Sequence, residues 1–177
     1  MRIINGKFKG RRFSPPANIT ARPTTDFAKE GIFNVLSNNY LDFEGKDILD
    51  LFAGTGSISL EFVSRGCLSV TSVEMSEKQL SFIHKIVNAL NIRNIRVLRT
   101  DVFRFLKSCE NKYDVIFADP PYQLVELETL PDLVFQRDLL KENGLFVLEH
   151  GSKNEFISHP HFVEHRVYGN VNFTIFR

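Results

Sequence analysis

Two short motifs contain the residues best suited to chemistry. The segment 50–56, with the letters DLFAGTG, has two glycines directly after an apolar run. The segment 119–122, DPPY, also follows an apolar run. Glycine lets the backbone approach a ligand closely, whereas two consecutive prolines fix φ and remove two backbone donors. We therefore expect the first segment to hold a cofactor and the second to hold the group that reacts.

The glycine turn lacks the features of two common nucleotide sites. A dinucleotide-binding turn would have a third glycine at position 59, where this chain has Ser59. A P-loop would have a Lys-Ser or Lys-Thr pair after the second glycine, and none follows. A diphosphate is therefore not the ligand that these residues favour.

Carboxylates stand near the ends of the first four predicted strands of the sheet. They are Asp50, Glu74, Asp101 and Asp119. Ligands of open α/β sheets bind beyond the carboxyl ends of the strands, so these side chains are expected to converge on one crevice. Poorly solvated carboxylates repel a diphosphate and attract a cation. S-Adenosylmethionine carries a sulfonium and an ammonium, and Glu74 lies where a carboxylate can accept both hydroxyls of its ribose.

The DPPY segment suits an exocyclic amine of a nucleobase as the reacting group. The lone pair of such an amine is delocalised into the ring, so its N–H groups need acceptors that draw the nitrogen toward a nucleophilic shape. The Asp119 carboxylate and the Pro120 carbonyl can be these acceptors. The ring of Tyr122 can stack on a base that has been turned out of its helix.

The elements that must position these motifs alternate along the chain. Helices are predicted at 24–40, 57–65, 77–90 and 102–109, and in part of 124–141, where Pro131 interrupts them. Strands are predicted at 47–52, 68–74, 95–98, 113–118, 144–150, 162–168 and 171–176. Thr25 or Asp26 is expected to cap the first helix, and Ser76 to open the third with a capping box. This alternation predicts an α/β, Rossmann-like fold with a mostly parallel seven-stranded sheet, helices on both faces and an antiparallel C-terminal edge strand.

The first 25 residues form a basic arm. They contain no acidic residue, and their basic residues are Arg2, Lys7, Lys9, Arg11, Arg12 and Arg22. Residues 26–177 carry 16 basic and 21 acidic side chains, so the formal net charge of +1 is the sum of a basic arm and an acidic body. Residues 2–13 alternate apolar and basic side chains around glycines, which predicts a β-hairpin that docks on the body. The basic side chains are expected to contact nucleic-acid phosphates.

The composition and the remaining residues limit the classes of protein to which this chain can belong. At 177 residues, with 43% hydrophobic and 24% charged, the chain fits one globular domain rather than a disordered or disulfide-rich class. Cys67 and Cys109 lie in apolar stretches, so both are expected to be reduced core residues. No apolar run is long enough for a signal peptide or a membrane span, which predicts a cytoplasmic protein. His159, His161 and His165 alternate as on an exposed strand, and no metal site is expected.

The two motifs together resemble the class I S-adenosylmethionine-dependent amino-methyltransferases. The beginning of the chain points to one family within this class. It has MRII followed by Gly6 and Lys7, KGR at 9–11, RPTTD at 22–26, and FN at 33–34. With these segments, essentially the whole chain is similar to the RsmD family of bacterial 16S rRNA (guanine-N2) methyltransferases. One departure is Phe27, where the family commonly has arginine, and it affects one RNA contact rather than the chemistry.

The resemblance implies a basic N-terminal arm, residues 1–23, and a methyltransferase domain, residues 24–177. The residues implied to bind S-adenosylmethionine are Asp50, Phe52, Ala53, Gly54, Thr55, Gly56, Glu74, Met75, Asp101 and Val102. Those implied to hold the guanine are Asp119, Pro120, Pro121 and Tyr122, with Asp119 as the principal polarising group. The implied substrate is 16S rRNA within a small-subunit particle, and we expect the protein to be a monomer without membrane contact.

Two other functions stay open. DNA adenine-N6 methyltransferases share the DPPY motif, so adenine in DNA is an alternative substrate. An RNA-binding assembly protein with a vestigial cofactor crevice is an alternative without catalysis. A nicotinamide oxidoreductase is disfavoured by Ser59 and by the acidic crevice.

Overall fold

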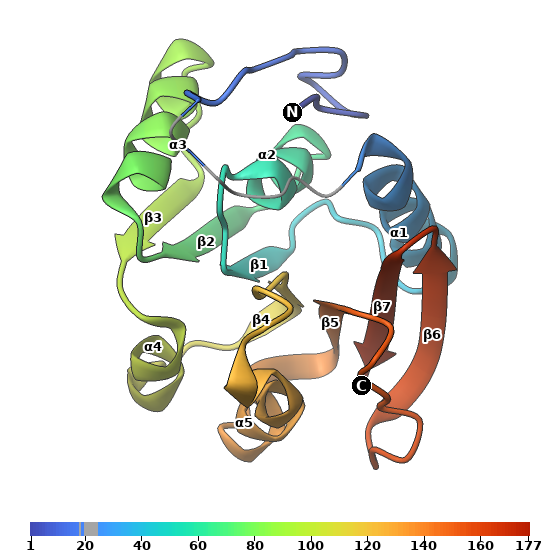
Figure 1. The fold of residues 1–177 in the computed structure, drawn as a ribbon. Coiled ribbons are helices and arrows are strands. Elements are labelled where there is room, and N and C mark those ends of the chain that lie inside the picture. Colours follow the sequence, from blue (N-terminus) through green and yellow to red (C-terminus); the bar gives the residue numbers. More distant parts are fainter. Residues whose placement is uncertain (18, 20–24) are drawn as a thin grey trace.

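Seven strands form one sheet through the middle of the molecule, with helices packed against it (Figure 1). The computed structural model describes residues 1–17, 19 and 25–177. The helices are α1 (Asp26–Asn39), α2 (Ser57–Ser64), α3 (Glu77–Ala89), α4 (Val102–Ser108) and α5 (Leu130–Gln136), with a 3-10 helix, η1, at Val125–Thr129. The strands are β1 (Asp47–Leu51), β2 (Ser69–Glu74), β3 (Ile95–Arg99), β4 (Tyr113–Ala118), β5 (Leu140–His150), β6 (Phe162–Tyr168) and β7 (Val171–Phe176).

The strand order is β3-β2-β1-β4-β5-β7-β6. β3, β2, β1, β4 and β5 are parallel, whereas β7 is antiparallel to both β5 and β6. The chain first moves outward from β1 to β3 and then returns to β4 on the other side of β1. The predicted mostly parallel sheet with an antiparallel C-terminal edge is confirmed. Ligands of such sheets bind where the strand order reverses, which here is between β1 and β4.

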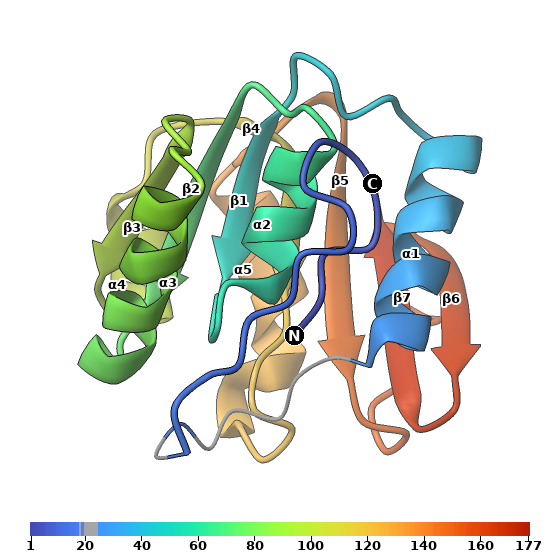
Figure 2. The ribbon, with the colours of Figure 1, turned by 90° about the horizontal axis from the view of Figure 1, so that it is seen from above.

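The two faces of the sheet carry different helices. α1, α2 and α3 cover one face, and α4 and α5 cover the other (Figure 2). On the first face, Phe33 of α1 and Phe62 of α2 are fully buried with ring centroids 4.6 Å apart, and Phe43 packs against both. Burial of one such ring contributes about 2 kcal/mol. This aromatic contact fixes α2, the helix that directly follows the glycine turn.

All eight residues of α2 are buried. The sheet lies on one side of this helix, α1 lies beside it, and the N-terminal segment crosses over it (Figure 2). The polar residues of α2 are therefore enclosed and must find partners inside the protein. Those partners come from β1, β2, α1 and the arm, so α2 connects the arm to the glycine turn.

Two capping predictions have different outcomes. The Thr25 hydroxyl accepts a hydrogen bond from the Ala28 backbone N–H at 3.2 Å, so the predicted cap of α1 is confirmed. The predicted capping box at Ser76 is wrong, because the Ser76 side chain makes no cap hydrogen bond. The Glu74 carboxylate instead accepts the Ser76 backbone N–H at 2.7 Å, which ties this helix start to the end of β2.

Two boundaries differ from the sequence-based expectation. The predicted N-terminal hairpin is shorter than expected, with an isolated bridge between Arg2 and Arg12. β5 begins at Leu140 rather than at 144, so residues 140–143 belong to the sheet and not to a helix. The Lys141 ammonium explains this extension, because it donates to carboxylates of Asp47 on β1 and Asp114 on β4, at 2.7 and 2.8 Å.

Candidate active site

The strand register brings the glycine turn and the DPPY segment together. β1 and β4 are parallel neighbours, and Leu51 pairs with Ala118 as the last pair of their ladder. The next residues are Phe52 and Asp119, so both motifs leave the sheet at the same edge and side by side. Neighbouring strands are about 4.8 Å apart. Two motifs that are distant in the chain therefore share one site.

The glycine turn has an unusual backbone. Phe52, Gly54 and Gly56 have φ values of 64°, 55° and 77°, in the left-handed region. A Cβ at Gly56 would also lie 3.0 Å from Cγ1 of Ile83 on α3. The turn is held by hydrogen bonds from the Ala53 N–H to Val73 and from the Gly56 N–H to Ala53. Only glycine satisfies both the backbone angle and the close packing at position 56.

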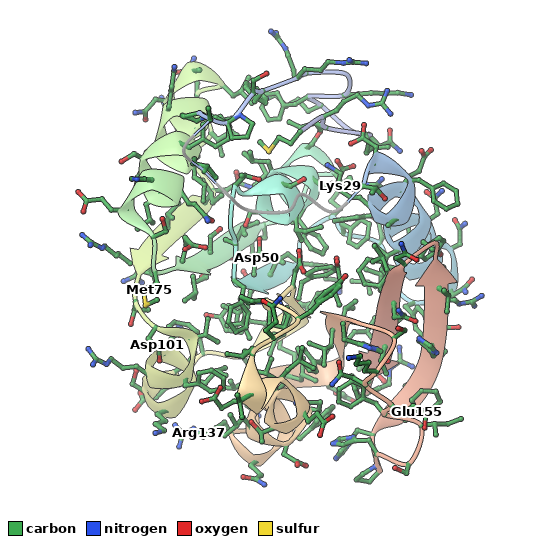
Figure 3. All side chains as sticks on the ribbon, in the orientation of Figure 1. Lys29, Asp50, Met75, Asp101, Arg137 and Glu155 are labelled. Atoms are coloured by element: carbon green, nitrogen blue, oxygen red, sulfur yellow. The ribbon has the colours of Figure 1, made fainter. Side chains whose placement is uncertain are left out.

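Asp50 lies behind the turn rather than on its surface. The side chain is 1% exposed, and Figure 3 shows it near the middle of the molecule. Its carboxylate accepts the backbone N–H of Ser59 at 3.0 Å and also the Ser59 hydroxyl, which in turn lies 2.6 Å from the Ser72 hydroxyl. The Ser59 N–H is one of the otherwise unpaired donors in the first turn of α2. Asp50 therefore holds α2 and the glycine turn in place from inside.

Burial raises the pKa of Asp50 to about 7, although the Ser59 hydrogen bonds act in the opposite direction. The folded protein consequently binds this proton more tightly than the unfolded chain does. We expect the contribution of Asp50 to the free energy of unfolding to be full below about pH 4 and to be lost as the pH rises through about 7. Urea unfolding at several pH values should show a flatter pH dependence for Asp50→Asn than for the wild type. Equal slopes would contradict this account of the residue.

Glu74 faces the glycine turn from the end of β2. One carboxylate oxygen accepts the Gly54 N–H at 2.9 Å, and the other accepts the Ser76 N–H at 2.7 Å. Met75 beside it is 67% exposed. Asp101 accepts the Arg104 N–H at 2.9 Å and caps α4, and Figure 3 shows Met75 and Asp101 at the same side of the molecule.

The other implied cofactor residues differ in exposure. Ala53, Thr55 and Val102 are 7%, 6% and 5% exposed. Phe52 is half-buried and packs against the core on the α4 and α5 face. Of the four carboxylates expected to converge, Asp50 is enclosed behind the turn and Asp101 caps α4.

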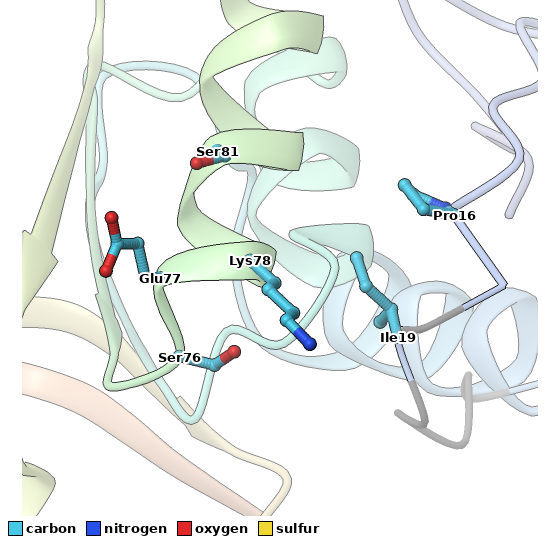
Figure 4. A pocket seen from close by; sticks show the side chains of 6 residues that line it. All are labelled: Pro16, Ile19, Ser76, Glu77, Lys78 and Ser81. Atoms are coloured by element: carbon cyan, nitrogen blue, oxygen red, sulfur yellow. The ribbon is translucent and has the colours of Figure 1, made fainter.

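A groove of about 790 Å³ opens beside the start of α3 (Figure 4). Pro16 and Ile19 of the N-terminal segment line one side, and Ser76 and Lys78 of the α3 start line the other. Figure 4 shows the Lys78 side chain extending toward Ile19. The groove thus lies between residues 16 and 19 of the N-terminal segment and the first turns of α3.

The DPPY segment combines buried and accessible groups. Pro120 is buried, Pro121 is exposed, and Asp119 and Tyr122 are half-buried. The Tyr122 hydroxyl donates to the Glu149 carboxylate at 2.8 Å. Glu149 was not among the residues expected from the sequence, although a carboxylate at the end of the wholly apolar run 145–148 was a usable signal.

The arm docks on α2 through its backbone. The Glu61 carboxylate, fully buried, accepts the N–H groups of Ile4 and Asn5 at 2.8 and 3.0 Å. The Ser64 hydroxyl accepts the Phe8 N–H at 2.9 Å, and the Ser64 carbonyl accepts the Lys7 N–H at 2.7 Å. Because backbone groups make these contacts, the basic side chains of the arm are left to face outward.

Lys29 connects the arm, α1 and the start of α2. This side chain is 1% exposed, and its ammonium donates to the Arg2 carbonyl at 2.6 Å and to the Ser57 hydroxyl at 3.0 Å. It also lies 3.8 Å from the Glu61 carboxylate. Burial lowers the pKa of Lys29, against the effect of Glu61. Sequence reasoning missed Lys29 and Glu61, because their partners lie far away in the chain.

The basic residues of the arm fall into two groups among the described residues. The exposed ones are Lys7, Lys9, Arg11 and Arg12. Arg2 is half-buried, with its guanidinium 2.9 Å from the Asp26 carboxylate. The prediction for Arg22 lies outside the described residues.

Other predicted features are also placed by the structure. Cys67 and Cys109 are buried and free, as predicted. The three histidines do not share one strand. His165 lies on β6, whereas His159 and His161 precede it, and the ring centroids of His161 and Phe135 are stacked 3.7 Å apart.

In the described ranges there is no group of three His, Cys, Asp or Glu that could hold a metal ion. The described helices include none with the length and apolar character that a membrane crossing requires.

The whole chain also matches a known family. The family model described as Conserved hypothetical protein 95 matches residues 1–177. A Ribosomal RNA small subunit methyltransferase D of Buchnera aphidicola is 35% identical over 161 residues, which cover 90% of this chain and 81% of that protein. The chain belongs to the RsmD family.

Two further comparisons agree with this membership of the RsmD family. The Escherichia coli K12 protein named Ribosomal RNA small subunit methyltransferase D is 31% identical, over 87% of this chain and 76% of its own length. The solved structure of a hypothetical protein from Thermus thermophilus superposes with a TM-score of 0.86 at 28% identity, covering 100% of this chain and 99% of that one. The Rossmann-like architecture of this RsmD family member is thus shared over its full length.

Proposed function

We propose that this protein transfers a methyl group from S-adenosylmethionine to the N2 amine of a guanine in 16S rRNA. The observation that carries the proposal is the pairing of β1 with β4, which places the glycine turn beside Asp119. One motif has the backbone of a cofactor turn, and the other has acceptors for an amine. The two relatives described above are named as small-subunit rRNA methyltransferases.

The residues around the turn fit S-adenosylmethionine. Glu74 accepts two backbone N–H groups, and the Gln79 amide reaches one of its oxygens at 3.2 Å. A carboxylate has about four acceptor positions, so a ribose diol would use the remaining position and replace the Gln79 amide at the other. Met75 offers an exposed apolar side chain for the adenine beside this carboxylate. When bound, the cofactor supplies a methyl group on a positively charged sulfur. Gly54 and Gly56 let the backbone approach its methionine end.

The protein contributes mainly position and acceptors. Asp119 and the Pro120 carbonyl accept the two N–H groups of the guanine amine, which directs the nitrogen lone pair toward the methyl carbon. As the N–C bond forms the S–C bond breaks, so that S-adenosylhomocysteine would leave as a neutral thioether and the amine would release one proton to solvent. Tyr122 stacks on the extruded base. Holding both reactants in line supplies the largest part of such a rate enhancement.

The arm is proposed to bind the rRNA. Its exposed charges on Lys7, Lys9, Arg11 and Arg12 lie on a backbone that is docked on α2. Each phosphate contact of this kind makes binding weaken as salt increases. We further propose a small-subunit particle as the substrate and a cytoplasmic monomer as the active form.

Transfer of labelled methyl groups tests the proposal against its alternatives. Small subunits from cells that lack the enzyme and unmethylated DNA are offered separately with labelled S-adenosylmethionine. Label in 16S rRNA supports the proposal, whereas label only in DNA favours the adenine-N6 alternative. The absence of any S-adenosylmethionine binding in calorimetry would favour an RNA-binding assembly protein.

Glu74→Gln is expected to weaken S-adenosylmethionine binding about 10- to 100-fold. An amide keeps one acceptor for the Gly54 N–H but cannot accept both ribose hydroxyls, and hydrogen bonds to charged groups are worth about 1.5–3 kcal/mol. Calorimetric titration with the cofactor measures the effect. Glu142→Gln, an exposed residue at the start of β5, is the matched control and should leave affinity unchanged. Equal affinities of both variants would remove Glu74 from the cofactor site.

A further inference from the structure

Glu149 is a buried carboxylate to which the proposed function gives no role. It lies near the end of β5 and is 4% exposed. β4 and β5 are parallel neighbours with Ala118 beside Leu148, so continuing the register by one residue brings Glu149 beside Asp119. A buried carboxylate is costly unless hydrogen-bond donors compensate for the water that it loses. The Tyr122 hydroxyl, which donates to Oε1 at 2.8 Å, is one such donor.

The Tyr122 ring lies near the end of β5. A Cβ at Gly151 would stand 3.4 Å from Cδ2 and 3.7 Å from Cγ of Tyr122, which is ordinary contact distance, so there is room for one more carbon between this glycine and the ring. Glu149 holds the hydroxyl at the far end of the same ring. Two prolines precede Tyr122 and fix the backbone that carries it. The side chain is consequently constrained at its hydroxyl and by the stiff backbone segment that precedes it.

We propose that Glu149 is a positioning residue, which holds Tyr122 in the orientation that stacks on the base to be methylated. This inference rests on the proposed function. A tyrosine that is already oriented loses less side-chain entropy when a base stacks on it. Small errors in the placement of the base reduce transfer strongly, because the amine must lie in line with the methyl group. Glu149 acts through Tyr122 and so affects the reaction without touching the reacting atoms.

The molecule contains a matched tyrosine–carboxylate pair outside this site. The Tyr40 hydroxyl donates to the Glu164 carboxylate at 2.7 Å, and this pair also is partly buried. It joins the C-terminal end of α1 to β6. Variants of this pair remove the same kind of hydrogen bond without changing the DPPY segment.

The test is a double-mutant cycle in kcat/KM, with small subunits that lack the modification as the substrate. Glu149→Ala and Tyr122→Phe are each expected to lower kcat/KM about tenfold, and the double variant is expected to be no worse than the poorer single variant. Glu149→Gln should stay within about threefold of the wild type, because its amide oxygen still accepts the hydroxyl. Tyr40→Phe and Glu164→Ala should stay within about twofold, since neither residue lies at the site.

Thermal unfolding and S-adenosylmethionine affinity are measured for every variant. If Glu149 had only a structural role, its replacement would lower the stability or the cofactor affinity, and the effects of Glu149 and Tyr122 on kcat/KM would not be coupled. Wild-type kcat/KM in Glu149→Ala, or losses that multiply in the double variant, would overturn the inference. If Glu149→Ala does not fold, the test rests on Tyr122→Phe. A kcat/KM equal to that of the wild type in Tyr122→Phe would then overturn the inference. Absence of transfer by the wild type would contradict the proposed function before any variant is compared.

Discussion

Replacing Asp119 by alanine is expected to lower methyl transfer at least about 100-fold, while S-adenosylmethionine affinity stays within about threefold. The residue leaves β4 next to the glycine turn, since Leu51 and Ala118 are paired at the ends of their strands. In the proposed reaction its carboxylate accepts an N–H group of the amine in the transition state, where positive charge develops on the nitrogen. An acceptor aimed at that charge stabilises the transition state more than the bound substrate.

Two further variants make the Asp119 result specific. Asp119→Asn keeps one neutral acceptor and should retain more activity than the alanine variant, because a charged acceptor forms the stronger hydrogen bond. Asp132→Ala removes an exposed carboxylate on α5 and should keep full activity. Single-turnover transfer to small subunits gives the rates, and calorimetry gives the cofactor affinity. Loss of cofactor binding together with transfer would show that Asp119 has a structural role instead.

Gly6→Ala is expected to displace the arm from α2. Gly6 has φ +82°, and a Cβ there would lie 1.8 Å from the carbonyl oxygen of Ser64, a backbone atom that cannot turn away. Displacement would separate the Ile4 and Asn5 amides from the buried Glu61 carboxylate. An unsatisfied buried charged group costs about 1–3 kcal/mol or more, so stability should fall by at least that amount.

Gly10 supplies the matched control for this substitution. It has the same φ of +82°, but nothing lies within 4 Å of a Cβ there. Gly10→Ala therefore carries the backbone strain, about 1 kcal/mol, without the collision. Urea unfolding measures the stability of both variants.

Loss of docking should also affect the reaction with RNA. We expect KM for small subunits to rise about tenfold in Gly6→Ala and to change less than about threefold in Gly10→Ala, because only the former misplaces the exposed basic residues. If Gly6→Ala and Gly10→Ala had the same stability and the same KM, the proposal that the docked arm binds the RNA would be contradicted.

The sequence predicted the architecture and the meeting of the two motifs well. Short apolar strands alternate with amphipathic helices, and this pattern restricts the fold to a covered parallel sheet. The motifs follow two such strands, so a parallel sheet places both at one edge. The register between Leu51 and Ala118 then confirmed that they are neighbours. Local pattern was sufficient here because each motif is continuous in the chain.

Several roles could not be predicted because they depend on contacts between distant residues. Asp50 was expected at the cofactor, yet its carboxylate lies inside and holds the N-terminus of α2. The Glu61 carboxylate accepts the backbone N–H groups of Ile4 and Asn5, which lie 57 and 56 positions earlier in the chain. Polar residues in a short helix are typical of a solvated surface, yet those of α2 are buried. The sheet and α1 enclose Ser59 and Ser57, and the docked arm encloses Glu61 and Ser64.

The position of the β5 start was missed for a similar reason. Lys141, Glu142 and Asn143 are polar and poor strand formers by composition. The strand extends over them because the Lys141 ammonium is paired with two carboxylates, one on the adjacent β4 and one on β1 beyond it. A long-range ion pair therefore overrides the local preference.

Nucleoside analysis of methylated 16S rRNA tests the central claim most directly. Small subunits that lack the modification are incubated with the protein and S-adenosylmethionine, and the rRNA is then digested and separated by mass spectrometry. The account predicts about one N2-methylguanosine per 16S rRNA, and its formation at least about 100-fold more slowly with Asp119→Ala. Methylation of adenine instead, or no methylated nucleoside at all, would contradict it.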